Sequence, residues 1–195
     1  MRRMKTDTLG SLFGSMGKVR IIRLFLFNPK SAFTVADIAS RSQVRPEEVC
    51  RELTSLHAAK LVHRTSGKKT KYTLDERSPY TAALQNLLLN LPLREGELHK
   101  RLEGMAGLKL LVLAGIFAGN MDARLDMLLV GDRMNERRIR TSMRRLEADM
   151  GREIRYTMLS VQDFRYRLNI SDRLTRDIFD YPHRIVLDKL DIGLK

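Results

Sequence analysis

The sequence predicts an α+β protein built from two domains, and three observations support this. Apolar residues recur at helical spacing in three stretches between residues 19 and 56. Two short alternating runs, 61–64 and 70–74, flank a polar turn and predict a β-hairpin. After Pro92, strand-like apolar runs alternate with amphipathic segments, which is typical of helices packed around a small sheet. The 195 residues therefore suggest domains at 1–91 and 92–195.

Three helices of the first domain have recognisable boundaries. Apolar spacing over residues 19–26 predicts the first, which we expect to end at Asn28 because the residue before a proline avoids helical backbone angles. Thr34 is the predicted N-cap of the second helix, and Asp37 is its capping-box partner. Pro46 suits the first position of the third helix, where no backbone N–H is needed.

The second domain is predicted to contain four strands and four helices. Ser160 and Asp163 form a second capping-box pattern at the start of one of these helices. The predicted strands are 108–113, 127–130, 155–159 and 185–187, and the predicted helices are 93–105, 135–150, 160–168 and 172–180.

Charge indicates the class of partner. The chain has 36 Lys and Arg against 23 Asp and Glu, a net charge of +13. Residues 1–90 contain 16 basic and 7 acidic residues, so most of the excess lies in the first domain. A basic domain attracts polyanions, either nucleic acid or an anionic membrane surface, although solubility alone is an alternative explanation.

Several classes of protein do not fit the composition. One cysteine, Cys50, excludes an internal disulfide framework and a multi-cysteine zinc site. No apolar run approaches the roughly 18 residues that span a bilayer, and the basic start lacks the apolar stretch of a secretory signal. We expect a cytoplasmic protein that needs no membrane, metal or cofactor.

The segment TVADIASRSQVRPEEVCRELTSLHAAKLVHRTSGKKTKYTL resembles the DNA-binding core of ArsR/MarR-like winged helix-turn-helix regulators, a similarity that covers residues 12–91. The resemblance implies that the third helix enters the major groove and that the hairpin wing contacts phosphates. The residues expected to contact double-stranded DNA are Arg45, Arg51, Thr54, Ser55, Arg64, Lys68, Lys69 and Lys71.

Other uses of such a domain stay open. These charges could form an ordinary solvated surface, and winged helices also serve as protein-binding modules. Metal-sensing members of the family use cysteine and histidine clusters, but Cys50, His57 and His63 have no further candidate ligands nearby.

The segment LKLLVLAGIFAGNMDARLDMLLVGD resembles the start of a minimal nucleotidyltransferase domain, and the similarity covers about residues 94–191. That family has a Gly-Ser turn that holds phosphates and an Asp-x-Asp pair that holds magnesium. Here Gly115 is followed by Ile116 in place of serine, and Arg124 replaces the first aspartate, which leaves Asp126.

These departures predict an inactive domain. Nucleotidyl transfer needs carboxylates to hold two Mg²⁺ ions, and we expect Arg124 to form an ion pair with Asp126 instead. An active domain would need Asp122 or Glu153 as substitute ligands. Nucleotide binding without turnover is a third possibility, through Arg124 and the basic helix that carries Arg133, Arg137, Arg138, Arg140, Arg144 and Arg145.

The leucine-rich helix predicted over residues 78–91 suggests assembly. Its apolar stripe is too large to face water comfortably, so we expect a homodimer that uses this helix together with Leu12 and Phe13. Packing of the stripe against its own domain is the alternative.

The whole chain therefore predicts a DNA-binding transcriptional regulator with a pseudo-nucleotidyltransferase domain. That second domain would serve assembly or respond to an effector or a protein partner. The alternatives are an active nucleotidyltransferase that modifies a partner protein and a protein-binding scaffold.

Overall fold

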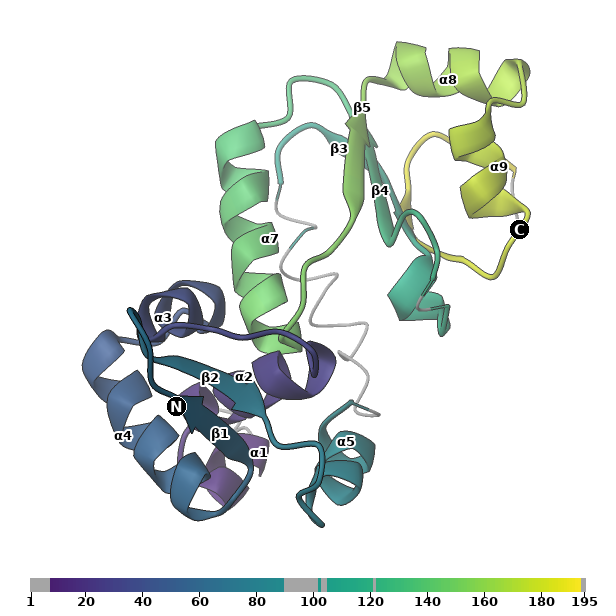
Figure 1. Cartoon of the computed structure of the whole chain (residues 1–195). Coiled ribbons are helices and arrows are strands. Elements are labelled where there is room, and N and C mark those ends of the chain that lie inside the picture. The colour runs from purple at the N-terminus through teal and green to yellow at the C-terminus, as the bar shows by residue number, and fades with distance from the viewer. Residues whose placement is uncertain (1–7, 90–101, 103–104, 121, 194–195) are drawn as a thin grey trace. The chain divides into compact units, whose positions relative to one another are not determined.

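The computed structural model describes residues 8–89, 102, 105–120 and 122–193 (Figure 1). Most of the helix expected at 93–105, and the end of the one expected at 78–91, lie outside these residues. The chain divides into two units, one formed by residues 1–91 with 144–153 and the other by 92–143 with 154–195. The first unit is mainly helical and the second contains a four-stranded sheet, which confirms the α+β class.

Residues 8–89 of the first unit form five helices and a hairpin. They are α1 (Thr8–Phe13), α2 (Met16–Phe27), α3 (Val35–Ser42), α4 (Pro46–Ala58), β1 (Val62–Thr65), β2 (Lys71–Leu74) and α5 (Thr81–Leu89). Buried apolar side chains from α2, α3, α4 and the hairpin form one core, in which Phe25 and Phe33 pack edge to face.

The predicted helix boundaries of this unit are confirmed. The Thr34 hydroxyl accepts a hydrogen bond from the amide of Asp37, and the Thr34 amide donates to the Asp37 carboxylate. The Thr34 hydroxyl also donates to the Asp37 carboxylate, and this bond, together with the one from the Thr34 amide, lowers the pKa of Asp37. Pro46 is the first residue of α4, and α2 ends before Asn28, which precedes Pro29.

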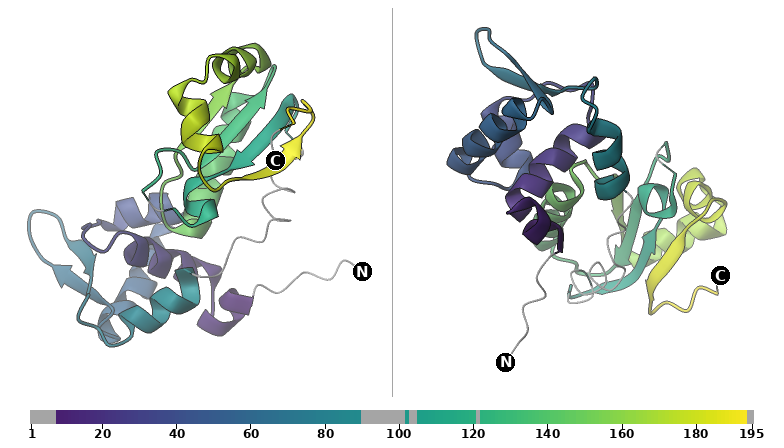
Figure 2. Two further views of the ribbon diagram at one scale, coloured as in Figure 1. Left: turned by 90° about the vertical axis from the view of Figure 1, so that its right-hand side faces the viewer. Right: turned by 90° about the horizontal axis from the view of Figure 1, so that it is seen from below.

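The hairpin is antiparallel, with Val62 opposite Leu74 and Thr65 opposite Lys71. Phe33 adds an isolated bridge to Tyr72, which ties the strand to the segment before α3. Figure 2 shows the turn of this hairpin projecting away from the helices of its unit.

Residues 144–153 also pack in the first unit, although the sequence assigns them to the second domain. Arg20 donates to the buried carboxylate of Asp149 through Nε at 2.8 Å, and Asn28 Nδ2 donates to the carbonyl of Gly151 at 2.9 Å. Gly151 has φ +79°, and a Cβ there would come within 2.5 Å of the backbone of Arg23. Glycine therefore allows the chain to pass closely over α2.

The second unit contains β3 (Leu108–Leu113), the 3₁₀ turn η1 (Gly115–Ala118), β4 (Met127–Gly131), β5 (Tyr156–Leu159), α8 (Val161–Asn169), α9 (Arg173–Phe179), β6 (Arg184–Asp188) and the first part of α7 (Glu136–Met150). The strand order is β5-β4-β3-β6. Only β4 and β5 run parallel, because α7 connects them as a crossover; the other two pairs are antiparallel.

Both faces of this sheet are covered. Leu110, Val112, Leu128 and Val130 point to one face, where they pack with α8 and α9 through residues such as Phe164. The alternating residues Leu111, Leu113, Met127 and Leu129 are also buried, on the other face. The strands therefore appear in the sequence as continuous apolar runs.

The Ser160 cap of α8 is also confirmed, since its hydroxyl accepts from the amide of Asp163 at 3.0 Å. Of the helices that the structure describes, none combines the length and the apolar character that crossing a bilayer requires.

Candidate functional site

All eight residues expected to contact DNA are exposed and belong to the first unit. Arg45 is the N-cap residue of α4, and Arg51, Thr54 and Ser55 lie within that helix; Arg64 is in β1, Lys71 is in β2, and Lys68 and Lys69 are in the turn.

Helix α4 presents three of these residues on one outer face. Val49, Leu53 and Leu56 form its buried stripe. At 100° per residue, Arg51, Thr54 and Ser55 lie opposite that stripe. The face is therefore available to a ligand, and Arg51 forms no ion pair with any residue that the structure describes.

The two hydroxyls on this face already have protein partners. The Thr54 hydroxyl donates to the carbonyl of Cys50 at 3.0 Å, and the Ser55 hydroxyl accepts from Lys18 Nζ at 3.4 Å. Lys18 Nζ also pairs with Glu52 at 3.1 Å. Of the three residues on this face, Arg51 therefore has the side chain without a partner among the residues that the structure describes.

The hairpin carries a positive charge without any acidic residue between 62 and 74. Residues directly opposite each other in a strand pair point to the same face, and successive residues alternate. Arg64 is opposite Tyr72 and Lys71 is opposite Thr65, so Arg64 and Lys71 point to opposite faces. One flat ligand cannot contact both in the same way, whereas Lys68 and Lys69 at the turn are available to either face.

The histidines of this unit do not form a metal site. His57 Nδ1 lies 3.0 Å from the carbonyl of Val62. Within the described part of the chain, no group of three or more His, Cys, Asp or Glu side chains could hold a metal ion.

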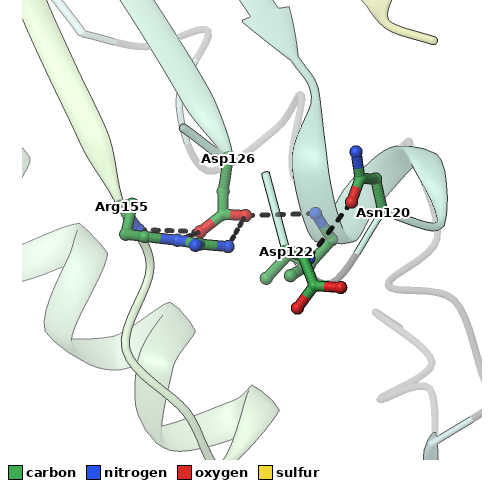
Figure 3. Close-up of polar contacts among 5 residues, drawn as sticks. Asn120, Asp122, Asp126 and Arg155 are labelled. Atoms are coloured by element: carbon green, nitrogen blue, oxygen red, sulfur yellow. Dashed lines mark hydrogen bonds and ion pairs between the residues drawn. The ribbon is translucent and has the colours of Figure 1, made fainter. Parts of the chain in front are cut away.

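In the second unit, Asp126 is fully buried immediately before β4 and is neutralised by Arg155 (Figure 3). Its Oδ2 accepts from Arg155 Nε at 3.0 Å and from the Arg155 amide at 2.9 Å. Its Oδ1 accepts from Arg155 Nη2 at 3.0 Å and from the amide of Ile116 at 3.1 Å. The hydrogen bond to Asp126 is the largest cause that raises the pKa of Arg155.

The expected partner of Asp126 was therefore wrong. Arg124 is exposed, whereas Arg155 makes the ion pair. The reason is strand register: β4 and β5 are parallel with Met127 opposite Tyr156, so the residues that precede them, Asp126 and Arg155, are neighbours. The sequence includes both residues, but it does not show which residues of β4 and β5 lie opposite each other.

Gly115 packs directly against Oδ1 of the Asp126 carboxylate. It has φ +51°, a conformation that L side chains rarely adopt, and a Cβ there would lie 2.3 Å from Asp126 Oδ1. The Gly115-Ile116 turn thus donates the Ile116 amide to Asp126. In this chain the turn supports a buried ion pair.

The substitute ligands considered for a metal are divided between the units. Glu153 belongs to the first unit and pairs with Arg41 at 3.2 Å. Asp122 is exposed in the second unit, where its amide donates to Asn120 Oδ1 at 3.1 Å. Asp126, with both oxygens bonded to Arg155, is not arranged as a magnesium ligand.

Comparisons of the chain with protein-family models, with curated proteins and with solved structures found no match.

Proposed function

We propose that the protein is a transcriptional regulator that binds double-stranded DNA through a winged helix-turn-helix in its first unit. The observation that carries the proposal is the exposed face of α4 beside a basic hairpin that lacks acidic residues. In such a domain, α4 enters the major groove and the hairpin contacts the phosphate backbone. Arg51 is the proposed base reader, because a guanidinium can pair bidentately with guanine.

Substitution of the hairpin lysines tests this proposal. Lys68→Ala with Lys69→Ala is expected to weaken binding to all duplexes alike, because phosphate contacts carry no sequence information. Each lost contact should flatten the slope of log K against log salt by about 0.9. Fluorescence anisotropy with duplexes between 50 and 200 mM salt provides the measurement.

Two comparisons make that test specific. Lys30→Ala with Lys189→Ala removes the same charge from exposed positions outside the proposed surface and should leave the slope unchanged. Arg51→Ala should cost roughly 1–3 kcal/mol on a selected site and relax preference at one base pair. If the hairpin variant binds like the wild-type protein across this range of salt, the scaffold function becomes the better explanation.

The second unit is proposed to be a nucleotidyltransferase-like domain without catalytic activity. The supporting observation is Asp126, which is buried and bound by Arg155 in the position where the resemblance requires a magnesium ligand. Incubation with labelled ATP, GTP, CTP and UTP and either Mg²⁺ or Mn²⁺ is expected to label no protein. Labelling that is lost in Asp126→Ala would instead support an active enzyme.

We propose that the protein forms a homodimer, but through fewer apolar residues than the sequence predicts for the leucine-rich helix and the segment around Leu12. Leu88 is buried and Leu84 packs against the core of its own unit, whereas Leu12, Tyr80 and Leu87 are 67%, 62% and 44% exposed. Among the described residues of the first unit, these three are the exposed large apolar side chains that a second copy could cover.

Light scattering of the full chain is expected to give twice the chain mass of 22.5 kDa at tens of micromolar. Leu12→Glu with Leu87→Glu should reduce that mass by half, because each places a charge in the interface. Ile170→Glu, at an exposed apolar position of the second unit, is the control and should stay dimeric. A wild-type monomer would contradict the dimer.

A further inference from the structure

Helix α7 has an arginine-rich outer face that the proposed functions leave unused. Residues 133–145 contain six arginines, no lysine and one acidic residue, Glu136. Ile139, Met143 and Leu146 form the buried stripe of the helix, with 1%, 1% and 2% exposure. The arginines of the helix lie away from that stripe and are exposed: Arg137, Arg138, Arg140, Arg144 and Arg145.

These arginines form two rows fixed by the geometry of one helix. Arg137 and Arg144 are seven residues apart, which places them on the same side about 10 Å apart along the axis. Arg138 and Arg145 have the same spacing and form the second row. Both rows lie on the single helix α7, so the spacing between their guanidinium groups is set by the geometry of that helix.

Little of this charge is neutralised within the protein. Arg140 lies 3.8 Å from Glu136, one turn earlier. Arg137, Arg138, Arg144 and Arg145 form no ion pair with any residue that the structure describes. Like charges on neighbouring turns of a helix destabilise it, so a ligand that neutralises them is favoured.

We propose that this face of α7 binds the phosphate backbone of double-stranded DNA, as a second contact beyond the one made by α4 and the hairpin. The inference rests on the proposed function, since it assigns the same ligand, duplex DNA, to a second surface of the chain. A guanidinium matches a phosphate through two parallel hydrogen bonds, which a lysine cannot provide. Duplex DNA supplies a continuous row of such phosphates.

An anionic membrane fits this helix less well. Helices that lie in a membrane surface insert their apolar face between the lipids. The apolar stripe of α7 is buried within the protein, so only its charge would be available. Membrane binding is therefore kept as an outcome of the experiment.

The test uses the full chain with Arg137, Arg138, Arg144 and Arg145 all replaced by glutamine, which has a similar helix propensity. The matched control replaces Arg165, Arg173, Arg176 and Lys189, which are exposed residues of the second unit, by glutamine. Circular dichroism verifies that each variant is folded. Anisotropy with a random-sequence duplex is measured between 50 and 200 mM salt, beside the Lys68→Ala, Lys69→Ala variant.

The α7 variant is expected to bind about tenfold or more weakly at 100 mM salt, with a salt slope flatter by about 2 or more, while the control stays close to wild type. Equal losses in the α7 variant and the control would show a general charge effect and overturn the inference. An unchanged α7 variant beside a weakened hairpin variant would overturn the inference and leave the proposed function standing. If the wild-type protein binds no duplex, the proposed function fails as well. Binding to phosphatidylserine vesicles that only the α7 variant loses would assign the face to membranes.

Discussion

Gly115→Ala is expected to destabilise the second unit by about 2–5 kcal/mol, the sum of a strained backbone and a steric clash. The left-handed conformation at φ +51° costs an L residue energy whatever the space around it. The added Cβ would also lie 2.3 Å from Asp126 Oδ1 and 2.6 Å from the carbonyl of Leu125. Asp126 cannot move aside easily, because Arg155 and the Ile116 amide hold both of its oxygens.

Gly119→Ala is the matched control for this prediction. Gly119 has φ +84° in the same turn, but a Cβ there would meet nothing within 4 Å. It should therefore cost only the backbone strain, about 1–2 kcal/mol. The difference between the two variants isolates the steric clash.

Native-state hydrogen exchange of the β3 and β4 amides measures this effect in the second unit alone. Urea unfolding followed by circular dichroism gives the global value, and the chain has no tryptophan to follow by fluorescence. Equal losses in Gly115→Ala and Gly119→Ala would mean that Asp126 does not pack against this turn.

The sequence was sufficient to predict elements whose signals are local. The capping boxes of Thr34 and Ser160, the proline at the start of α4 and the limits of β3 all depend on residues within a few positions of one another. Capping and hydrophobic periodicity determine such boundaries directly. The exposure of the eight expected DNA contacts follows from the same periodicity.

The features that sequence reasoning missed depend on long-range packing. Asp149 and Gly151 bind α2 from more than 120 positions away, and nothing in the helical pattern of 135–150 indicates that partner. Arg155 was similarly overlooked because Arg124 is closer to Asp126 in the sequence. Apolar runs on both sides of a crossover helix are typical of neighbouring parallel strands. Aligning the two strands that follow Asp126 and Arg155 in this way would have placed these two residues side by side.

The second large effect is expected at Arg155. Arg155→Met keeps an unbranched stem but leaves the fully buried Asp126 carboxylate with only backbone amides as donors. Removal of one partner from a buried ion pair costs about 3–5 kcal/mol. The Arg155 side chain is 38% exposed, so water can partly replace the missing guanidinium beside Asp126. We therefore expect a loss of about 3 kcal/mol in the free energy of unfolding. Arg155→Lys, which retains the charge but not the bidentate geometry, should give a smaller loss.

Arg124→Met is the control that distinguishes the two arginines. Arg124 is exposed and does not bind Asp126 in the structure, so its replacement should change the free energy of unfolding by less than about 0.5 kcal/mol. A loss at Arg124 as large as that at Arg155 would contradict the observed pair.

A double-mutant cycle with Asp126→Asn completes the argument. If Arg155 stabilises the unit through the charge of Asp126, the two substitutions together should cost less than the sum of their separate effects, with a coupling of about 1–3 kcal/mol. Additive losses would mean that each side chain acts through other neighbours. A strong coupling would show that Arg155, which lies immediately before β5, neutralises this carboxylate from within the protein. It would also explain how the second unit can keep a carboxylate as deeply buried as Asp126.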